Sequence, residues 1–407
     1  MKRMILCSFL VASSISTFAQ APAPSWSQWR GPARDGVASS FTVPTAWPAQ
    51  LTRRWQVPVG LGHASPVVSG NRVVVHTRQG TRELVSAFDL QSGKPLWQDG
   101  VEAPYTMNQA ATGHGPGPKS TPAIAGGRVF TLGISGIFSA HDLATGKLLW
   151  RKNAPPAPPE FGTAASPLVD GSTVIAFLGG AGAGALTALD AATGAVKWRW
   201  TGDGPGYASP ILATLVGTRQ VITQSQSKLV GVDAASGQLL WELAIKTPYE
   251  QNSVTPMVMG DLVLYAGLEN PTVALRITKT GAKWTTAAAW RNQEVAMYMS
   301  SPAVSGTAIY GLSTKNRGQF FALDAASGKT LWLTRGREAE NAAIVRAGEF
   351  LLMTTTNSEL VVARANPARF EEVKRYPVAD SAMWAHPAFT ERTIIVKDLD
   401  KLIAWTF

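Results

Sequence analysis

Short apolar segments that begin at a proline recur along most of the chain. Each follows a Ser-Pro, Thr-Pro or His-Pro pair, and most lead through a Gly or Asp turn into a second segment rich in Val and Ile. Proline is tolerated at the first residue of a β-strand, where its missing N–H costs least. The pattern therefore predicts repeated units of short strands, which start at Ser65-Pro66, Thr121-Pro122, Ser166-Pro167, Ser209-Pro210, Thr255-Pro256, Ser301-Pro302 and His386-Pro387.

A second motif follows later in most units. In its first copy a small residue, Ala87, is followed by Asp89, Gly93 and Trp97. The Asp can accept backbone N–H groups in a tight turn, the Gly can adopt the positive φ that closes the turn, and the Trp suits the gap between two packed sheets. We therefore expect a β-hairpin corner in each copy. Further copies begin at Ala140, Ala188, Gly231 and Ala322, a weaker one runs from Ala274 to Trp284, and one from Ala363 to Val373 lacks the Trp.

The ends of the chain indicate how the units are arranged. An eighth, degenerate unit starts at Ala342-Ala343-Ile344, placed by counting back from Gly348. The last unit stops after a third strand at 402–407, while a Trp-bearing strand at 51–57 precedes the first unit. Pairing these two strands would close a ring and hide the sheet edges. We predict an all-β protein, an eight-bladed β-propeller of four-stranded antiparallel blades over residues 51–407, closed by the N-terminal strand in the last blade.

Residues 1–19 have the pattern of a secretory signal peptide. Two basic residues precede an apolar run at 4–11, and small residues lead to a cleavage site near Ala19. The run is too short to span a membrane, and no later segment has the roughly 18 uninterrupted apolar residues of a transmembrane helix. We expect a periplasmic or secreted protein in which residues 20–50 form an N-terminal strap along the propeller.

Charge and cysteine content narrow the classes of partner and site. The net charge is +10, but only 16% of residues are charged and the longest basic run after the signal peptide is Arg53-Arg54, so no basic stripe indicates a nucleic-acid surface. The single cysteine, Cys7, lies in the signal peptide. The mature chain would therefore hold no disulfide, no Cys-based zinc site and no catalytic Cys. We expect a monomer that binds no nucleic acid.

The corner motif reads A-x-D-x-x-[ST]-G-x-x-x-W, and through it the chain resembles the propellers built from pyrroloquinoline-quinone (PQQ)-like repeats. The opening at 26–36 and Gly62-His63-Ala64-Ser65-Pro66 look like an exported bacterial branch of that family. The family includes quinoprotein dehydrogenases and the BamB-type scaffold of outer-membrane β-barrel assembly. The resemblance thus implies a fold rather than one function.

This chain departs from the dehydrogenases of the family, which carry a vicinal Cys pair, a calcium site and an Asp base. Its mature part has no Cys and no evident set of calcium ligands. The resemblance therefore implies a scaffold with no catalytic residues and no cofactor, which binds a periplasmic or outer-membrane protein. One alternative is a PQQ-dependent or quinone-binding oxidoreductase, with Trp384 stacked on the quinone and Lys119 meeting a carboxylate. Another is a propeller that binds a small molecule or carbohydrate at the channel mouth.

Two rings of positions are expected at the mouth of the channel. The residue one before each proline is a hydroxyl in most units, which suggests a bond to the backbone of the neighbouring blade. The residue three before each proline varies, as in a ligand surface, although a solvated loop edge is the alternative. Positions two apart share a face of a strand, so both rings can face the channel. The predicted ligand-binding residues are His63, Lys119, Tyr207, Met299, Asn341, Trp384 and His386.

Three of the five histidines precede the inner strands of consecutive blades. These are His63, His114 and His386, which are candidate ligands for Zn²⁺ or Cu²⁺. No short His-x-His spacing supports such a site, and we expect no metal. The longest connector, 99–119, is interpreted either as a binding loop or as a mobile insertion.

Overall fold

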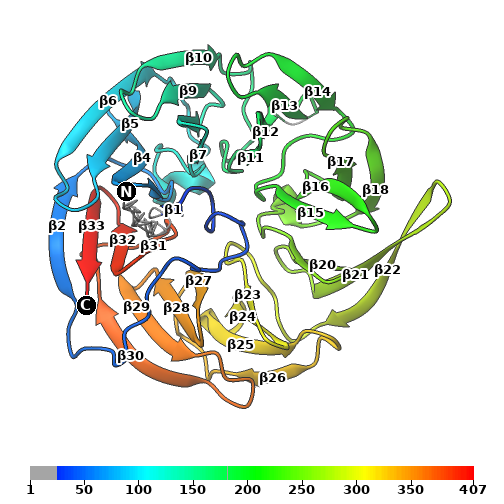
Figure 1. Cartoon of the computed structure of the whole chain (residues 1–407). Coiled ribbons are helices and arrows are strands. Elements are labelled where there is room, and N and C mark those ends of the chain that lie inside the picture. Colours follow the sequence, from blue (N-terminus) through cyan, green and yellow to red (C-terminus); the bar gives the residue numbers. More distant parts are fainter. Residues whose placement is uncertain (1–24, 181) are drawn as a thin grey trace, which may run out of the picture.

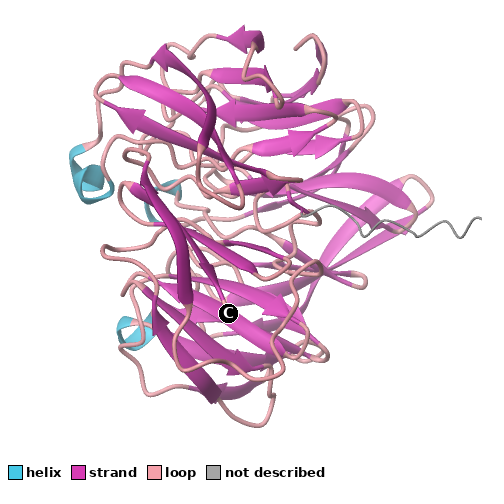
Figure 2. Cartoon of the chain, turned by 60° about the vertical axis from the view of Figure 1, so that its left-hand side comes forward, coloured by secondary structure: helices cyan, strands magenta, loops and turns pink. Residues whose placement is uncertain are grey.

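The computed structural model describes residues 25–180 and 182–407 (Figure 1). The predicted signal peptide, its cleavage site near Ala19 and the first residues of the predicted strap lie outside the described residues. In the described part, strands dominate and the helices are short 3-10 turns: η1 (Gln109–His114), η2 (Pro248–Glu250) and η3 (Lys315–Arg317) (Figure 2). None of the helices described is long and apolar enough to cross a membrane.

The strands form eight antiparallel sheets, which surround a central channel as the blades of a propeller (Figure 1). The predicted fold class is confirmed. Seven blades have four strands, and blade 1 gains a fifth because β1 pairs with its innermost strand.

Blades 1 to 4 come from the first half of the chain. Blade 1 contains β1 (Ser25–Trp26), β3 (Val67–Ser69), β4 (Arg72–Gln79), β5 (Arg82–Asp89) and β6 (Pro95–Glu102). Blade 2 contains β7 (Ala123–Ala125), β8 (Arg128–Leu132), β9 (Phe138–Asp142) and β10 (Leu148–Lys152). Blade 3 contains β11 (Leu168–Asp170), β12 (Thr173–Leu178), β13 (Ala185–Asp190) and β14 (Val196–Trp200). Blade 4 contains β15 (Ile211–Leu215), β16 (Thr218–Gln224), β17 (Lys228–Asp233) and β18 (Leu239–Ala244).

Blades 5 to 8 follow in the same order around the ring. Blade 5 contains β19 (Met257–Met259), β20 (Leu262–Tyr265), β21 (Thr272–Thr280) and β22 (Lys283–Asn292). Blade 6 contains β23 (Ala303–Ser305), β24 (Ala308–Ser313), β25 (Gln319–Asp324) and β26 (Thr330–Leu333). Blade 7 contains β27 (Ala342–Ala347), β28 (Phe350–Thr355), β29 (Glu359–Arg364) and β30 (Glu371–Pro377). Blade 8 contains β31 (Ala388–Thr390), β32 (Thr393–Lys397), β33 (Lys401–Thr406) and β2 (Thr52–Pro58).

Blade 8 closes the ring with strands from both ends of the propeller. Strand β2 pairs antiparallel with β33, from Thr52 opposite Thr406 to Pro58 opposite Lys401. The two lie side by side at the left of Figure 1, β2 in blue and β33 in red. The predicted closure by the N-terminal strand is therefore confirmed, and the outer edge of β33 is not left open.

In blades 1, 2, 3, 4 and 6 the corner motif joins the blade to the one before it. The Asp89 carboxylate accepts the N–H groups of Gln91 (3.1 Å) and Ser92 (2.8 Å), and Gly93 has a φ of 70°. A Cβ on Gly93 would lie 2.7 Å from the ring of Trp55 in the preceding blade, so this position needs glycine for space as well as for conformation. The Trp side chains complete the contact by donating their indole N–H to a carbonyl in the next blade, as Trp97, Trp150 and Trp198 do.

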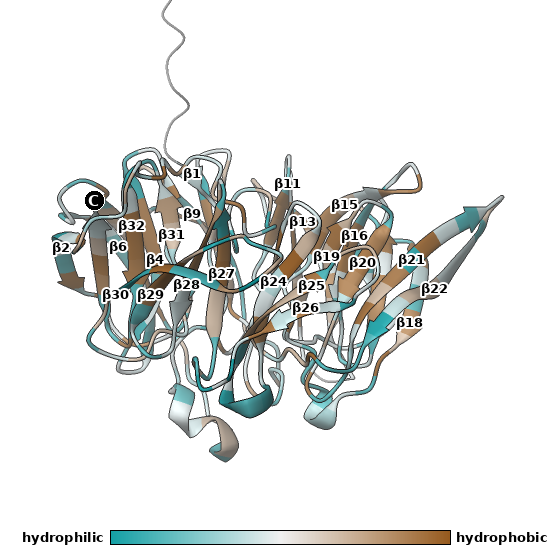
Figure 3. Ribbon diagram, turned by 90° about the horizontal axis from the view of Figure 1, so that it is seen from below, coloured by the Kyte–Doolittle hydropathy of each residue, from teal (hydrophilic) through white to brown (hydrophobic). Residues whose placement is uncertain are grey.

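Blade 5 differs from the sequence-based expectation. The sequence pattern predicts Trp284 at the corner position, and this prediction is wrong. In the structure Trp290 pairs with Ala274 and its ring packs on Gly328. Its indole N–H donates to a carbonyl of blade 6. Arg276 replaces the turn-forming Asp, so the strands continue and β21 and β22 form a long hairpin that projects from the ring (Figures 1 and 3). Trp284 lies instead near the hairpin tip, with the Lys279 ammonium 4.9 Å from its ring centroid.

The N-terminal segment runs from the channel to the outer rim. Strand β1 lies beside β3, and the chain then crosses the central channel (Figure 1). The Ala38 N–H donates to the Arg346 carbonyl (2.8 Å) in blade 7, and Trp47 is buried against Phe350 and Tyr376 of blade 7 and against Phe407. The segment therefore packs first into the channel and only then along the propeller.

Candidate functional site

Hydrogen bonds from backbone to hydroxyl join neighbouring blades around the channel. The N–H of the residue before the proline donates to the hydroxyl at the same position of the next blade, as from Ser65 to Thr121 (3.1 Å) and from Thr121 to Ser166 (2.9 Å). Equivalent bonds link blades 3 and 4, 5 and 6, and 8 and 1. The prediction that these hydroxyls bond the neighbouring backbone is confirmed for these blades. Blades 7 and 8 carry Ala343 and His386 at this position and offer no hydroxyl.

Two buried arginines fix the N-terminal segment inside the channel. Arg30 donates to the carbonyls of Ser301 (2.7 Å) and Pro302 in blade 6. Arg34 donates to the carbonyl of Pro167 (2.7 Å) and to the one before it (3.1 Å) in blade 3. Burial lowers the pKa of Arg30 to about 10 and that of Arg34 to about 9, so both guanidinium groups stay charged at neutral pH. The segment is thus tied to two separate sides of the ring.

Trp29 of this segment forms the floor of a cavity at the channel mouth. Its indole N–H donates to the hydroxyl of Thr255 (2.9 Å) in blade 5. Its ring packs against the imidazole of His386 in blade 8, with the ring centroids 4.2 Å apart. Both residues line the cavity. The N-terminal segment therefore supplies part of the site, a role that repeat counting could not assign to it.

The cavity has a volume of about 450 Å³, in the range of small-molecule pockets. It opens on the face of the propeller that carries the short helices, at the bottom of Figure 3. It is lined by all seven residues that stand three before a proline and by Asn341, the equivalent residue of blade 7 counted back from Gly348. The ring predicted from the sequence is thus brought together in space. The lining includes every predicted ligand-binding residue: His63, Lys119, Tyr207, Met299, Asn341, Trp384 and His386. Their role in binding remains a prediction.

The connector at 99–119 builds one wall of this cavity. Asn108 caps η1 by accepting the Ala110 N–H (2.8 Å), and its side-chain amide donates to Glu160 (3.1 Å). Asn108, Ala110 and His114 face the cavity, and His114 meets Trp384 edge to face with ring centroids 4.6 Å apart. The connector thus lies where a binding loop would be needed.

Lys119 is the ammonium group of the cavity wall. Its Nζ donates to the Phe161 carbonyl (3.0 Å), and burial lowers its pKa to about 8. A second ammonium, that of Lys397, lies behind the wall and donates to the Gly62 carbonyl (2.6 Å). Burial, and then the charge of Lys397, lowers the pKa of His63 to about 3, so this imidazole is neutral at pH 7.

The three candidate metal ligands do not converge. The rings of His63 and His114 lie 6.0 Å apart, whereas His386 packs on Trp29. Among residues 25–180 and 182–407, no group of three His, Cys, Asp or Glu side chains is arranged to hold a metal ion.

Several lining residues were missed by the sequence analysis. Phe161, Tyr249, Gln251 and Tyr298 all lie in the loops that enter the inner strands. The Tyr298 hydroxyl donates to the side chain of Gln251, which joins the loops of blades 5 and 6. These loops differ in length and sequence, so no repeat spacing marks their residues.

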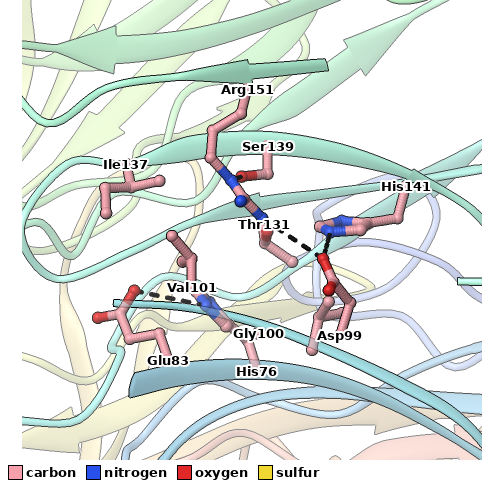
Figure 4. Close-up of a pocket in the computed structure, with 11 residues that line it drawn as sticks. His76, Glu83, Asp99, Gly100, Val101, Thr131, Ile137, Ser139, His141 and Arg151 are labelled. Atoms are coloured by element: carbon pink, nitrogen blue, oxygen red, sulfur yellow. Dashed lines mark hydrogen bonds and ion pairs between the residues drawn. The ribbon is translucent and has the colours of Figure 1, made fainter. Parts of the chain in front are cut away.

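A second polar cluster lies between blades 1 and 2 and was also missed (Figure 4). His76 and Glu83 come from the first blade, with 3.6 Å between His76 Nε2 and Glu83 Oε2. Asp99 accepts from Arg151 Nη2 (3.4 Å) and lies 2.9 Å from Nε2 of His141. The space between these side chains is only about 10 Å³, enough for a water molecule but not for a substrate.

Burial controls the ionisation of this interblade cluster. It raises the pKa of Glu83 to about 7, against the opposing effect of the Ile134 N–H, which donates to Glu83 Oε1 (2.9 Å). It lowers the pKa of His76 to about 3 and also lowers that of His141, although the bond to Asp99 acts in the opposite direction. The cluster holds neutral imidazoles next to one carboxyl that titrates near neutrality.

Solved structures share the fold of this chain. The structure of BamB from Moraxella catarrhalis has a TM-score of 0.63 at 16% identity and covers 88% of this chain and 98% of that one. Quinohemoprotein alcohol dehydrogenase from Comamonas testosteroni has a TM-score of 0.68 at 16% identity, covering 94% of this chain and 80% of the enzyme. Because scaffold and enzyme are about equally similar in shape, the fold does not separate the two functions.

Sequence comparison also matches both classes, but it covers more of this chain for the assembly factors than for the dehydrogenase subunits of quinone alcohol dehydrogenases, such as that of Komagataeibacter europaeus, which is 34% identical over 29% of this chain and 17% of that protein. The outer membrane protein assembly factor BamB of Bordetella pertussis is 24% identical over 366 residues, which is 81% of this chain and 89% of that protein. A family model described as outer membrane protein assembly factor BamB matches residues 81–334, more than half of the chain. The chain therefore belongs to the BamB family of PQQ-like repeat propellers.

Proposed function

We propose that this chain is a non-catalytic scaffold of the bacterial envelope that binds a protein partner. The observation that carries the proposal is family membership over residues 81–334, together with a relative named as an outer membrane protein assembly factor that the chain matches over 89% of its length. The partner would be a periplasmic or outer-membrane protein. The proposal includes export as a monomer after cleavage near Ala19, which mass spectrometry of the mature protein would test.

The architecture supports a rigid binding platform. Trp side chains at the rim and hydroxyls at the channel bond most blades to a neighbouring blade. The N-terminal segment adds bonds from Arg30 to blade 6 and from Arg34 to blade 3. A ring braced in this way presents loops in fixed positions, which lowers the entropic cost of binding a partner.

The cavity residues do not fit PQQ, the cofactor of the related dehydrogenases. PQQ carries three carboxylates, whereas Lys119 is the one Lys or Arg among the described residues that line the cavity. Burial lowers the pKa values of His63, His114 and His386, so these imidazoles would not replace the missing positive charge. Calcium prefers six to eight oxygen ligands, and Glu160 is the one carboxylate of the described lining. This donor set supports a protein without a quinone cofactor.

A gene deletion tests the scaffold proposal. We expect the deletion strain to contain less folded outer-membrane β-barrel protein, measured by heat-modifiable mobility in gels of membrane fractions, and the wild-type gene to restore it. An unchanged level of every such protein would contradict the proposal. A parallel assay adds PQQ and Ca²⁺ to the purified chain, and reduction of an artificial dye with an alcohol substrate would favour the enzyme instead.

A further inference from the structure

The cavity at the channel mouth is a cup with a built floor. Trp29 and His386 pack against each other beneath it with their rings tilted by 43°, and Trp29 is held by its hydrogen bond to Thr255. His386 is only 2% exposed, and neither of its ring nitrogens has a hydrogen-bond partner among the described residues. A buried polar group without a partner costs free energy, so this floor has unused hydrogen-bonding capacity.

The wall of the cup holds a positive charge that has no anionic partner among the described residues. The Lys119 ammonium bonds to a backbone carbonyl rather than to a carboxylate, which leaves donors for another acceptor. Nε2 of His63 is buried and also lacks a partner within the described part of the chain. The lining carboxylate, Glu160, accepts a hydrogen bond from the Asn108 amide. An anion with one negative charge would satisfy Lys119 and would lie close to His63.

The remaining surface of the cup suits an aromatic group. Trp384 lies beside both imidazoles, with its ring centroid 4.6 Å from that of His114 and 6.3 Å from that of His63. Phe161 and Tyr207 approach each other on the wall next to Lys119, with centroids 5.9 Å apart. Aromatic surfaces at these spacings favour edge-to-face or offset contact with a further ring.

We propose that the cup binds a single carboxylate carried on an aromatic group, with the carboxylate at Lys119 and His63 and the ring against Trp384. Two sources share this chemistry: the C-terminal aromatic residue of a polypeptide and a free aromatic acid. The proposal assigns a ligand class to a site that scaffolding does not require. One charge on the ligand matches one ammonium in the wall, in contrast to the three carboxylates of PQQ.

Matched acids and amides test this proposal on the purified mature chain. The probes are N-acetyl-phenylalanine and the peptide acetyl-Ala-Ala-Ala-Phe, each as free acid and as amide, titrated by calorimetry and tryptophan fluorescence. We expect the acids to bind at least about tenfold more tightly than the amides, because the amide forfeits a charge-assisted bond. Preference for the peptide acid would indicate a chain end as ligand, and preference for the short acid a free metabolite.

Variants of the wall identify the group responsible. Lys119→Met is expected to reduce the acid-to-amide ratio to within about twofold, while Lys119→Arg retains most of it. Lys94→Met removes an exposed lysine at the blade 1 corner and serves as the matched control. Glu160→Gln removes a negative charge from the wall and should strengthen binding of the acids about two- to threefold. If Lys119→Met does not fold, this variant tests whether the charge of the wall controls binding.

Three results would overturn the proposal: no binding of any probe, equal affinity of acids and amides, or an unchanged ratio in Lys119→Met. The gene-deletion assay of the scaffold uses none of these probes. Either conclusion can therefore fail while the other stands.

Discussion

Two groups of buried histidines in this propeller differ in the side chains and in the space that surround them. At the channel mouth His63, His114 and His386 share a cavity of about 450 Å³ with aromatic rings and an ammonium group. Between blades 1 and 2, His76 and His141 share about 10 Å³ with two carboxyl groups and an arginine. The mouth has space for a ligand, whereas the interblade cluster has almost none. Both regions contain imidazole nitrogens without a hydrogen-bond partner among the described residues, Nδ1 of His76 and of His141 included. The first arrangement suits binding and the second suits packing.

The electrostatic environments of these two groups of histidines also differ. At the mouth, burial and neighbouring cations both lower the pKa of His63. An added anion would therefore offset an excess of positive charge at this site. In the interblade cluster, burial lowers the pKa of His141, but Asp99 compensates with a hydrogen bond and an opposite charge. The cluster is therefore already balanced and has less to gain from a ligand.

The largest expected effect comes from removing the support beneath the mouth. Arg30→Met leaves the buried carbonyls of Ser301 and Pro302 without their guanidinium donor. We expect the free energy of unfolding to fall by about 3–5 kcal/mol, measured by urea denaturation. Arg53→Met, at an exposed position of β2, is the control and should change it by less than about 0.5 kcal/mol.

The same variant separates the two regions. The floor residue Trp29 is next to Arg30 in the chain, so its fluorescence should change, while the NMR signals of His76 and His141 should stay in place. A loss below about 1 kcal/mol would mean that the N-terminal segment does not brace the channel.

The wall residues of the channel mouth could be predicted from the sequence because their positions recur in each blade. Ser-Pro, Thr-Pro and His-Pro pairs fix the start of seven inner strands, so counting three residues back from the proline gave seven wall positions, including Lys119 and Trp384. The eighth, Asn341, was counted back from Gly348. The hairpin corners could be predicted in the same way, because Asp89 and Gly93 form the turn through local backbone geometry. Periodic positions transfer from blade to blade because each blade has the same strand order.

Residues outside the repeated positions could not be located by counting along the repeats. Trp29 reaches the mouth through a segment outside the repeats, and Trp290 took the place of Trp284 once Arg276 removed the turn signal. The interblade cluster joins Asp99 of β6 to His141 of β9 across two separate sheets. Strand alternation gives the face on which a side chain lies, but the partner on the next blade depends on how the two sheets pack.

Glu83→Gln tests whether the interblade cluster is closed to water. The raised pKa of Glu83, about 7, means that the folded state holds this proton more tightly than the unfolded state does. Its contribution to stability is thus fully present below the unfolded pKa and is lost as the pH rises through about 7. Gln does not ionise, so between pH 5 and 8 the stability of the variant relative to wild type should increase by about 2–3 kcal/mol.

Measuring the variant against wild type at each pH removes the contributions of the other groups. His76, whose lowered pKa makes it lose stability as the pH falls, is present in both proteins and cancels. Glu102→Gln, an exposed position on β6, is the control and should show the same relative stability at both pH values. A flat difference for Glu83→Gln as well would show that solvent reaches this carboxyl group.

The smallest effect comes from a pair of glycine variants that compares the two regions directly. A Cβ on Gly133 would lie 2.0 Å from Glu83 Oε2, and Glu83 is held by the Ile134 N–H. A Cβ on Gly113, beside His114 at the mouth, would meet no atom within 4 Å. Neither glycine has a positive φ, so the comparison is one of space alone.

We expect Gly133→Ala to lower the free energy of unfolding by about 1–3 kcal/mol, because the carboxyl group must leave its N–H partner or the blades must separate. Gly113→Ala should change it by less than about 0.5 kcal/mol. Urea denaturation of both variants, and of Gly133→Ala combined with Glu83→Ala, gives the coupling between the two positions. Truncating Glu83 frees the space, so the double variant should lose less than the sum of the single losses. If the losses simply add, the clash is not with Glu83, and the contrast between a closed cluster and an open mouth loses its basis.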